Sequence, residues 1–165
     1  MNDLSIFRNG EALDYTKMGE IEILPDALSF DAFVNAFKNS PNASNTQSNA
    51  ILYTTPAGKI RIYLPQAHGH FFRYGKFGNG KIDRQTLTGS LMPILDKPLF
   101  VTKDEADTLY FYKPFKSKNG EFLDLISVSV AKNGRFEYRT TYEDTLNQVL
   151  DMIDGYEVIY KARLE

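Results

Sequence analysis

The feature that most constrains the fold is an alternation of strand-like runs and turn dipeptides between Thr108 and Tyr142. Three runs rich in aromatic or β-branched residues are separated by Asn119-Gly120 and by Asn133-Gly134. Asn-Gly adopts the positive φ angles of a tight turn at low cost, which makes it a strong short-range signal for a β-hairpin. The stretch therefore predicts a three-stranded antiparallel meander, and other parts of the chain must cover one of its faces.

Periodic patterns elsewhere predict additional strands and several helices. The expected strands are Glu20–Leu24, Ala50–Thr54 and Ile60–Leu64 around a turn at Pro56–Gly58, Leu99–Thr102, and Tyr156–Lys161. The expected helices are Ser29–Lys38, a short one within Gln66–Lys76, one from Asp83 toward Leu95 with a kink at Pro93, and Thr145–Ile153, ended by Gly155. Because strands outnumber helices and cluster in runs, the predicted class is α+β: a twisted antiparallel sheet of four to six strands packed against two or three helices.

The best candidate for a domain boundary is the polar run Asn39–Asn49. This run is rich in Asn and Ser, a composition typical of a flexible linker. We therefore expect residues 1–49 to form an N-terminal helical segment followed by a linker. Residues 50–165 are expected to form the α+β domain.

Charge is distributed unevenly along the chain, although the formal net charge is only −2. Met1–Ser40 has three basic and seven acidic residues, a net charge of −4. Lys59–Arg84 has six basic residues against Asp83 alone, a net charge of +5, and it contains both histidines of the chain. A basic block that also holds every imidazole is a candidate anion-binding site. An ordinary solvated surface is the alternative, and the charge pattern alone favours neither.

Several classes of site are disfavoured by composition. The chain has no cysteine, so thiolate nucleophiles, disulfides and cysteine-based zinc sites are excluded. No glycine-rich cofactor fingerprint is present, and we expect no cofactor. His68 and His70 supply only two potential metal ligands with no carboxylate nearby, so we expect no metal. The chain has no long apolar run and no signal-peptide pattern at its start, so we expect no membrane partner and a cytoplasmic location.

Three constellations have side chains suited to binding or cleaving a phosphate ester. His68 and His70 could act as acid and base, with Arg73 close behind them in the sequence. Lys113 precedes a proline, and is expected at a strand end where it can reach a ligand. In the run Phe136–Tyr142, strand alternation puts Glu137, Arg139 and Thr141 on one face. The corresponding alternatives are surface histidines, a lysine protecting a sheet edge, and salt pairing on a solvated face.

Four segments resemble a known nuclease family when they are taken in order. They are Pro98–Val101, Tyr110–Phe115, Leu123–Val130 and Phe136–Tyr142, preceded by a strand pair and a His-bearing segment. Together they are similar to the phage-associated branch of the Barnase–EndoU–colicin–RelE nuclease superfamily. The resemblance spans about residues 50–160, and it implies a helical part followed by a twisted antiparallel sheet. The glycine-rich stretch Tyr74–Gly80 departs from the family, in which a clearer helix follows the histidine.

The resemblance implies metal-independent RNA cleavage. Either His68 or His70 would fill the place of the family's histidine, Lys113 that of its lysine, and Arg139 to Tyr142 that of its basic-Thr-x-Tyr run. Residues 50–165 are then a nuclease-like domain. The expected catalytic residues are His68, His70, Arg73, Lys113, Arg139, Thr141 and Tyr142, and the expected substrate-binding residues are Arg61, Tyr63, Tyr74, Lys76 and Arg84.

The leading hypothesis is thus a toxin-like or phage-associated ribonuclease whose partner is RNA. In this chemistry the ribose 2′-OH attacks the adjacent phosphodiester, which requires an acid, a base and cations near the phosphate. An immunity protein or a phage structural protein is a further expected partner. The rival hypothesis is a catalytically inactive interaction module of a phage or mobile element, because a fold does not determine function.

Overall fold

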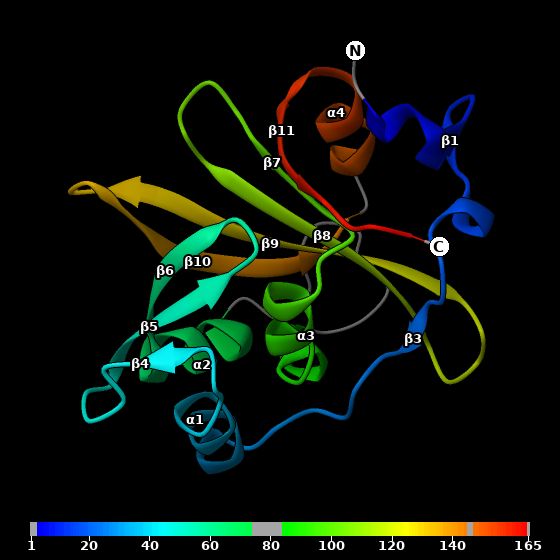
Figure 1. Ribbon diagram of the computed structural model, residues 1–165. Coiled ribbons are helices and arrows are strands. Elements are labelled where there is room, and N and C mark those ends of the chain that lie inside the picture. The colour runs from blue at the N-terminus through cyan, green and yellow to red at the C-terminus, as the bar shows by residue number, and fades with distance from the viewer. Residues whose placement is uncertain (1–2, 74–83, 145–146, 165) are drawn as a thin grey trace.

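The computed structural model describes residues 3–73, 84–144 and 147–164. The chain forms a large curled sheet with helices packed on both sides, which confirms the predicted α+β class (Figure 1). The strands are β1 (Arg8–Asn9), β2 (Ala12–Leu13), β3 (Glu22–Ile23), β4 (Ala43–Ser44), β5 (Ala50–Thr55), β6 (Gly58–Tyr63), β7 (Phe100–Lys103), β8 (Leu109–Lys116), β9 (Phe122–Lys132), β10 (Arg135–Glu143) and β11 (Glu157–Lys161). The α-helices are α1 (Phe30–Lys38), α2 (Leu64–Arg73), α3 (Leu91–Asp96) and α4 (Gln148–Gly155), and the 3₁₀-helices are η1 (Asp3–Phe7), η2 (Tyr15–Lys17) and η3 (Arg84–Leu87).

The predicted meander is confirmed as β8, β9 and β10, paired in antiparallel fashion. Asn133 and Gly134 both have positive φ angles, 53° and 81°, as a tight two-residue turn between β9 and β10 requires. The β8–β9 connection is wider, and in it Gly120 has a φ of 85°. The meander is therefore specified by local residues.

The sheet is larger than expected and mixed in direction. Among the described residues, nine strands join it, in the order β11-β7-β8-β9-β10-β6-β5-β4 with β3 beside β8, whereas four to six were predicted. The pairs β10–β6 and β3–β8 are parallel, so the sheet is not purely antiparallel. Alternation along a sequence shows that a strand forms but not which distant strand it pairs with, and both parallel pairs join segments far apart in the chain.

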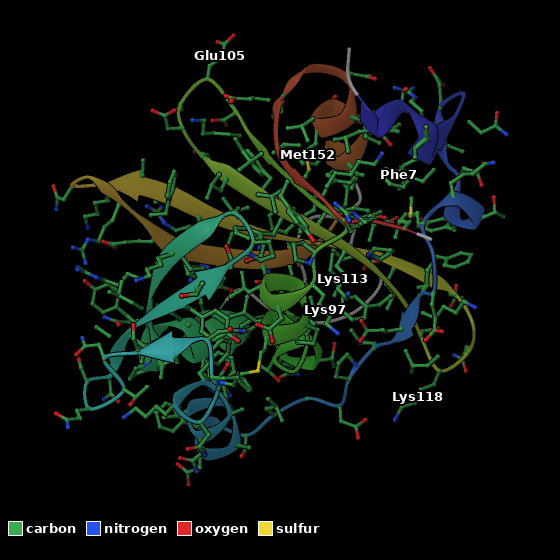
Figure 2. The ribbon with its side chains drawn as sticks, viewed as in Figure 1. Phe7, Lys97, Glu105, Lys113, Lys118 and Met152 are labelled. Carbon is green, nitrogen blue, oxygen red and sulfur yellow. The ribbon has the colours of Figure 1, made fainter. Side chains whose placement is uncertain are left out.

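Two apolar clusters lie on opposite faces of the sheet. The first packs α1, α2 and α3 against one face, and includes Phe33, Phe37, Leu95 and Phe111. The second packs η1 and α4 against the other face and includes Phe7 and Met152, which are labelled in Figure 2. The nonpolar face of each helix is buried in one of these clusters. This burial of nonpolar side chains is the main driving force for packing the helices against the sheet.

Two helix predictions need correction. The helix predicted to run from Asp83 to Leu95 is divided into η3 and α3, although Leu87, Leu91 and Leu95 are all buried as expected. Pro93 lies in the first turn of α3, where its missing N–H removes no helical hydrogen bond, so it does not kink the helix. The predicted cap Asp83 lies outside the described residues.

The last helix also begins later than predicted. The helix α4 begins at Gln148, and the predicted start at Thr145 lies outside the described residues. Asp144 caps the first turn of α4. The carboxylate of Asp144 accepts hydrogen bonds from the backbone N–H groups of Gln148, at 3.0 Å, and Val149, at 2.8 Å. The helix ends at Gly155, as predicted.

The polar run Asn39–Asn49 contributes a short strand to the sheet. Its Ala43 and Ser44 form β4, which pairs with β5, and the backbone carbonyl of Asn42 accepts a 2.9 Å hydrogen bond from Thr54. The side chain of Asn42 also donates to Asp96, at 3.1 Å. These bonds contradict the expectation of a flexible linker, whereas the division into residues 1–49 and 50–165 stays a prediction.

Gly89 allows the N-terminal segment to pack closely against the turn between η3 and α3. A Cβ atom added at Gly89 would lie 2.1 Å from the backbone oxygen of Asp26, a contact that real Cβ atoms do not make. We expect Gly89→Ala to lower the free energy of unfolding by about 1–3 kcal/mol, measured by urea denaturation. Gly155→Ala is the control, because nothing lies within 4 Å of the added Cβ. Equal stability of both variants would contradict this packing.

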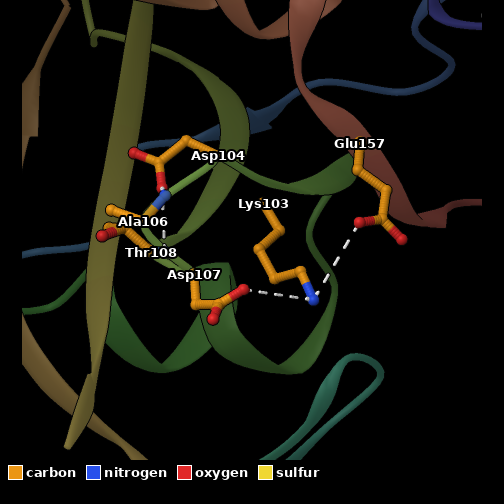
Figure 3. Close-up of polar contacts among 6 residues, drawn as sticks. All are labelled: Lys103, Asp104, Ala106, Asp107, Thr108 and Glu157. Carbon is orange, nitrogen blue, oxygen red and sulfur yellow. Dashed lines mark hydrogen bonds and ion pairs between the residues drawn. The ribbon is translucent and has the colours of Figure 1, made fainter.

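Asp104 organises the turn between β7 and β8 (Figure 3). Its carboxylate accepts hydrogen bonds from the backbone N–H groups of Ala106, at 2.9 Å, and Thr108, at 3.0 Å, and from the hydroxyl of Tyr110, at 2.8 Å. Burial acts to raise the pKa of Asp104, but these three hydrogen bonds outweigh it, and the pKa is lowered from its ordinary value of 3.8. A lowered pKa means that the ionised form stabilises the folded state at neutral pH.

Replacement of Asp104 should therefore reduce stability in a pH-dependent way. We expect Asp104→Asn to lower the melting temperature at pH 7, and the difference from the parent to shrink as the pH falls below the ordinary value of 3.8. Asp107→Asn is the control, because Asp107 only forms an exposed 3.6 Å ion pair with Lys103. A melting-temperature difference that is the same at pH 7 and pH 2 would contradict the role of the carboxylate.

Candidate functional site

A charged pocket opens where β6 and β10 separate. The two strands pair in parallel only at Ile60 with Phe136 and at Arg61 with Glu137; after Tyr63 the chain leaves β6 and enters α2. The resulting pocket has a volume of about 380 Å³. It is lined by side chains of β6, α2, β9 and β10: Tyr63, Gln66, Ala67, His70, Lys132, Glu137, Tyr138 and Arg139.

The helical period of α2 separates the two histidines. His70 lies on the same side as Gln66, four residues earlier, and both line the charged pocket. His68 faces α1: it is only 7% exposed, its Nε2 lies 3.1 Å from the backbone oxygen of Leu28, and its ring packs 5.2 Å from that of Phe33. Of the two candidates left open by the sequence, His70 is the one that can meet a ligand.

The β10 side of the pocket presents a carboxylate and a guanidinium. Glu137 and Arg139 both line it, and so does Tyr138 between them, whereas Thr141, the third residue expected on this face, does not. A register shift between β9 and β10 falls at Arg139, between Tyr138 and Thr140. Such a bulge changes the direction of a side chain from the one it would have in a regular strand. The side chain of Arg139 is exposed at this point.

Arg61 and Tyr63 flank this charged face. Arg61 is the register partner of Glu137 on the neighbouring parallel strand, and its Nη1 donates a 3.3 Å hydrogen bond to the hydroxyl of Tyr63. Tyr63 is exposed and lines the pocket. Two residues expected to bind substrate are therefore brought next to two expected from β10.

Three other predicted residues lie behind the pocket wall. Thr141 is buried, and its Oγ1 lies 2.7 Å from the hydroxyl of Tyr138. Arg84 is also buried; its Nη1 donates to the Oγ1 of Thr140 at 3.1 Å, and its guanidinium lies 5.9 Å from the ring centroid of Tyr142. Burial, with Asp144 nearby, raises the pKa of Tyr142 to about 12, so its hydroxyl is neutral at pH 7. These groups support β10 and do not line the pocket.

Lys113 does not line the charged pocket, and lies beside Lys97 (Figure 2). Its Nζ forms a 2.9 Å ion pair with Glu22 of β3 and donates a 2.6 Å hydrogen bond to the backbone oxygen of Lys97. It lines a separate cavity of about 910 Å³ between the N- and C-terminal segments. Pro114 does not end the strand, because β8 continues to Lys116. The expectation that Lys113 lies at a strand end, free to reach a ligand, is wrong. Its partner Glu22 comes from a parallel strand far away in the chain, and a local sequence pattern does not show this.

Three predicted residues cannot be compared with the pocket. Tyr74 and Lys76 lie outside the described residues, and so does the side chain of Arg73. Conversely, Glu137, Lys132 and Gln66 line the pocket but were not among the expected catalytic or substrate-binding residues. Lys132 could have been found from its position beside the Asn133-Gly134 turn, which carries it back toward β10.

No similarity to a known protein identifies the function of this pocket. Comparison of the chain with protein-family models, with curated proteins and with solved structures found no match. The resemblance to the nuclease superfamily therefore stays a prediction. Within residues 3–73, 84–144 and 147–164, no group of three or more His, Asp or Glu side chains could hold a metal ion. None of the helices described is long and apolar enough to cross a bilayer.

The placement of Lys113 implies a structural role. The side chain of Lys113 is only 11% exposed in its contacts with Glu22 and Lys97, whereas that of Lys118, which pairs with Asp26 at 3.0 Å, is 77% exposed. We expect Lys113→Met to lower the free energy of unfolding by about 2 kcal/mol in urea denaturation. Lys118→Met, the matched control, should change it by less than about 0.5 kcal/mol. Equal effects of the two substitutions would contradict this assignment.

Proposed function

We propose that this chain is a metal-independent ribonuclease, in which the ribose 2′-OH attacks the adjacent phosphodiester within the charged pocket. The observation that carries the proposal is the meeting of His70, Glu137 and Arg139 in one pocket, from a helix and a strand far apart in the sequence. An acid, a base and a cation are the groups that this reaction needs. The pocket volume of about 380 Å³ is within the range that binds small ligand groups.

Glu137 and His70 divide the proton transfers between them. The carboxylate of Glu137 accepts the proton of the 2′-OH as the oxygen forms its bond to phosphorus. The imidazolium of His70 gives a proton to the 5′-oxygen as the P–O5′ bond breaks. The products are a 2′,3′-cyclic phosphate and a 5′-hydroxyl, so no water or metal enters this step.

Cations at the pocket stabilise the charge that develops on phosphorus-bound oxygens. Arg139 lies in the pocket with Lys132, and Arg61 lies beside Glu137 on the neighbouring strand. A guanidinium can donate two parallel hydrogen bonds to a phosphate, which positions the group as well as neutralising it. Tyr63 stands at the edge of the pocket, where its ring can contact a base.

The direct test is cleavage of labelled RNA in the presence of a chelator. We expect the parent chain to produce 2′,3′-cyclic phosphate ends. His70→Ala and Glu137→Gln should each lower the rate about 10²–10⁴-fold, because each removes a proton-transfer group. Arg139→Gln should lower it about 10²–10³-fold by removing a donor to the phosphate.

Matched controls separate chemistry from folding. Arg135→Gln changes an exposed cation on the same strand that does not line the pocket, and should leave the rate unchanged. His68→Gln changes the other imidazole; it should lower the melting temperature, because His68 is buried, while cleavage persists. Parental cleavage rates in His70→Ala would contradict the proposal, and so would a dependence on added divalent metal.

The rival interaction module has weaker support. The observation in its favour is the acidic segment Met1–Ser40, which could cover a basic groove. Two of those acids are engaged elsewhere: Glu22 pairs with Lys113 and Asp26 with Lys118, and neither lysine lines the charged pocket. Absence of cleavage by the parent chain would favour this module over the nuclease.

A further inference from the structure

A second cavity adjoins the charged pocket and differs from it in chemistry. Its volume is about 580 Å³, and it shares Tyr63 and Gln66 with the charged pocket. The rest of its lining is Ser48, Asn49, Ala50, Pro65 and Gly69, with no charged side chain. A charged pocket and a neutral one therefore meet on either side of one tyrosine and one glutamine, both of them exposed.

The wall of the neutral cavity is fixed in place by backbone contacts. The backbone oxygen of Asn49 accepts a 2.8 Å hydrogen bond from Leu64, the first residue of α2. The Oγ of Ser48 accepts a 3.0 Å hydrogen bond from the N–H of Ala50. These contacts tie the β4–β5 connection to the start of α2, so the cavity is largely formed before any ligand binds.

Two carboxamides are available within this fixed wall. Among the described residues, the side chains of Asn49 and Gln66 make no hydrogen bond to the protein. A carboxamide offers one acceptor and two donor hydrogens, a combination that matches the edge of a nucleobase. Together with the ring of Tyr63, they provide a stacking surface and hydrogen-bonding groups without a charge.

Gly69 gives an independent indication that the cavity is kept open. It lies inside α2, where glycine is among the poorest helix formers. Its φ is not in the left-handed region, and an added Cβ would meet nothing within 4 Å, so neither backbone conformation nor packing requires a glycine. Gly69 does line the neutral cavity, and a glycine allows a ligand to approach the helix backbone closely.

We propose that the neutral cavity binds the nucleobase of the nucleotide whose phosphate occupies the charged pocket. The base stacks on Tyr63, the amides of Asn49 and Gln66 contact its edge, and the absent side chain of Gly69 leaves room for its ring. This inference rests on the proposed ribonuclease for the identity of the neighbouring phosphate. The neutral lining favours a base over a second phosphate, because a phosphate bound there would meet no cation.

The test uses DNA oligonucleotides that each contain a single ribonucleotide, with A, C, G, U or no base at that position. We expect the parent chain to cleave its preferred base with a kcat/KM roughly tenfold or more above that of the abasic ribose. Gly69→Leu, which fills the cavity, should reduce cleavage of that base to the level that the parent chain shows with the abasic ribose. Arg135→Gln is the control: Arg135 is exposed and lines neither pocket, so this variant should keep the parental base preference.

A second variant and a binding measurement distinguish failure of the base site from failure of the ribonuclease. Asn49→Ala with Gln66→Ala changes exposed side chains, so the protein folds even if Gly69→Leu does not, and it should flatten the base preference. Unchanged base preference in this variant, with cleavage intact, overturns the base site and leaves the ribonuclease standing. If the parent cleaves nothing, nucleoside 3′-monophosphates are titrated by NMR. Shifts at Tyr63 and Gly69 that Gly69→Leu abolishes then support the base site alone, and absence of such shifts overturns it.

Discussion

A two-residue parallel ladder between β6 and β10 joins the β5–β6 hairpin to the meander. Because paired residues of neighbouring strands share a face, Ile60 and Phe136 both turn toward the core formed with α1, α2 and α3. The second pair joins Arg61 to Glu137, and Glu137 lines the charged pocket. A longer ladder would close the gap between the strands, whereas two pairs hold the sheet together and still let the strands separate. The charged pocket occupies that separation, so the site depends directly on how short the pairing is.

The helix α2 completes the site because it begins where β6 ends. Its buried face, with Ala67 and Phe71, packs into the core, and this burial fixes the rotation of the helix about its axis. The same rotation turns His70 toward β10 and His68 toward α1. Hydrophobic packing thus decides which imidazole can meet a ligand. It also directs Gln66 and Gly69 toward the pocket and the neutral cavity, which links the two parts of the proposed site.

Local patterns in the sequence predict the elements well and their partners poorly. The Asn-Gly dipeptides and strand alternation are sufficient to predict the meander, and alternation also predicts that Glu137 and Arg139 share a face. The parallel pairs β10–β6 and β3–β8 leave no local signal, since each depends on two distant segments being complementary. Lys113 was misplaced for this reason: its partner Glu22 comes from β3. The burial of Arg84 and Thr141 likewise depends on long-range packing, and strand alternation around a bulge cannot predict it.

The central claim is that a phosphodiester binds beside His70 and not beside His68. The chain contains two histidines, so their imidazole NMR signals can be assigned by single substitution and followed separately. The decisive measurement is titration with a 2′-deoxy dinucleotide, which lacks the attacking hydroxyl and therefore binds without being cleaved. The account predicts that the His70 resonances shift in proportion to occupancy while those of His68 stay in place. Shifts confined to His68, or no shift of either imidazole at saturating dinucleotide, would contradict it.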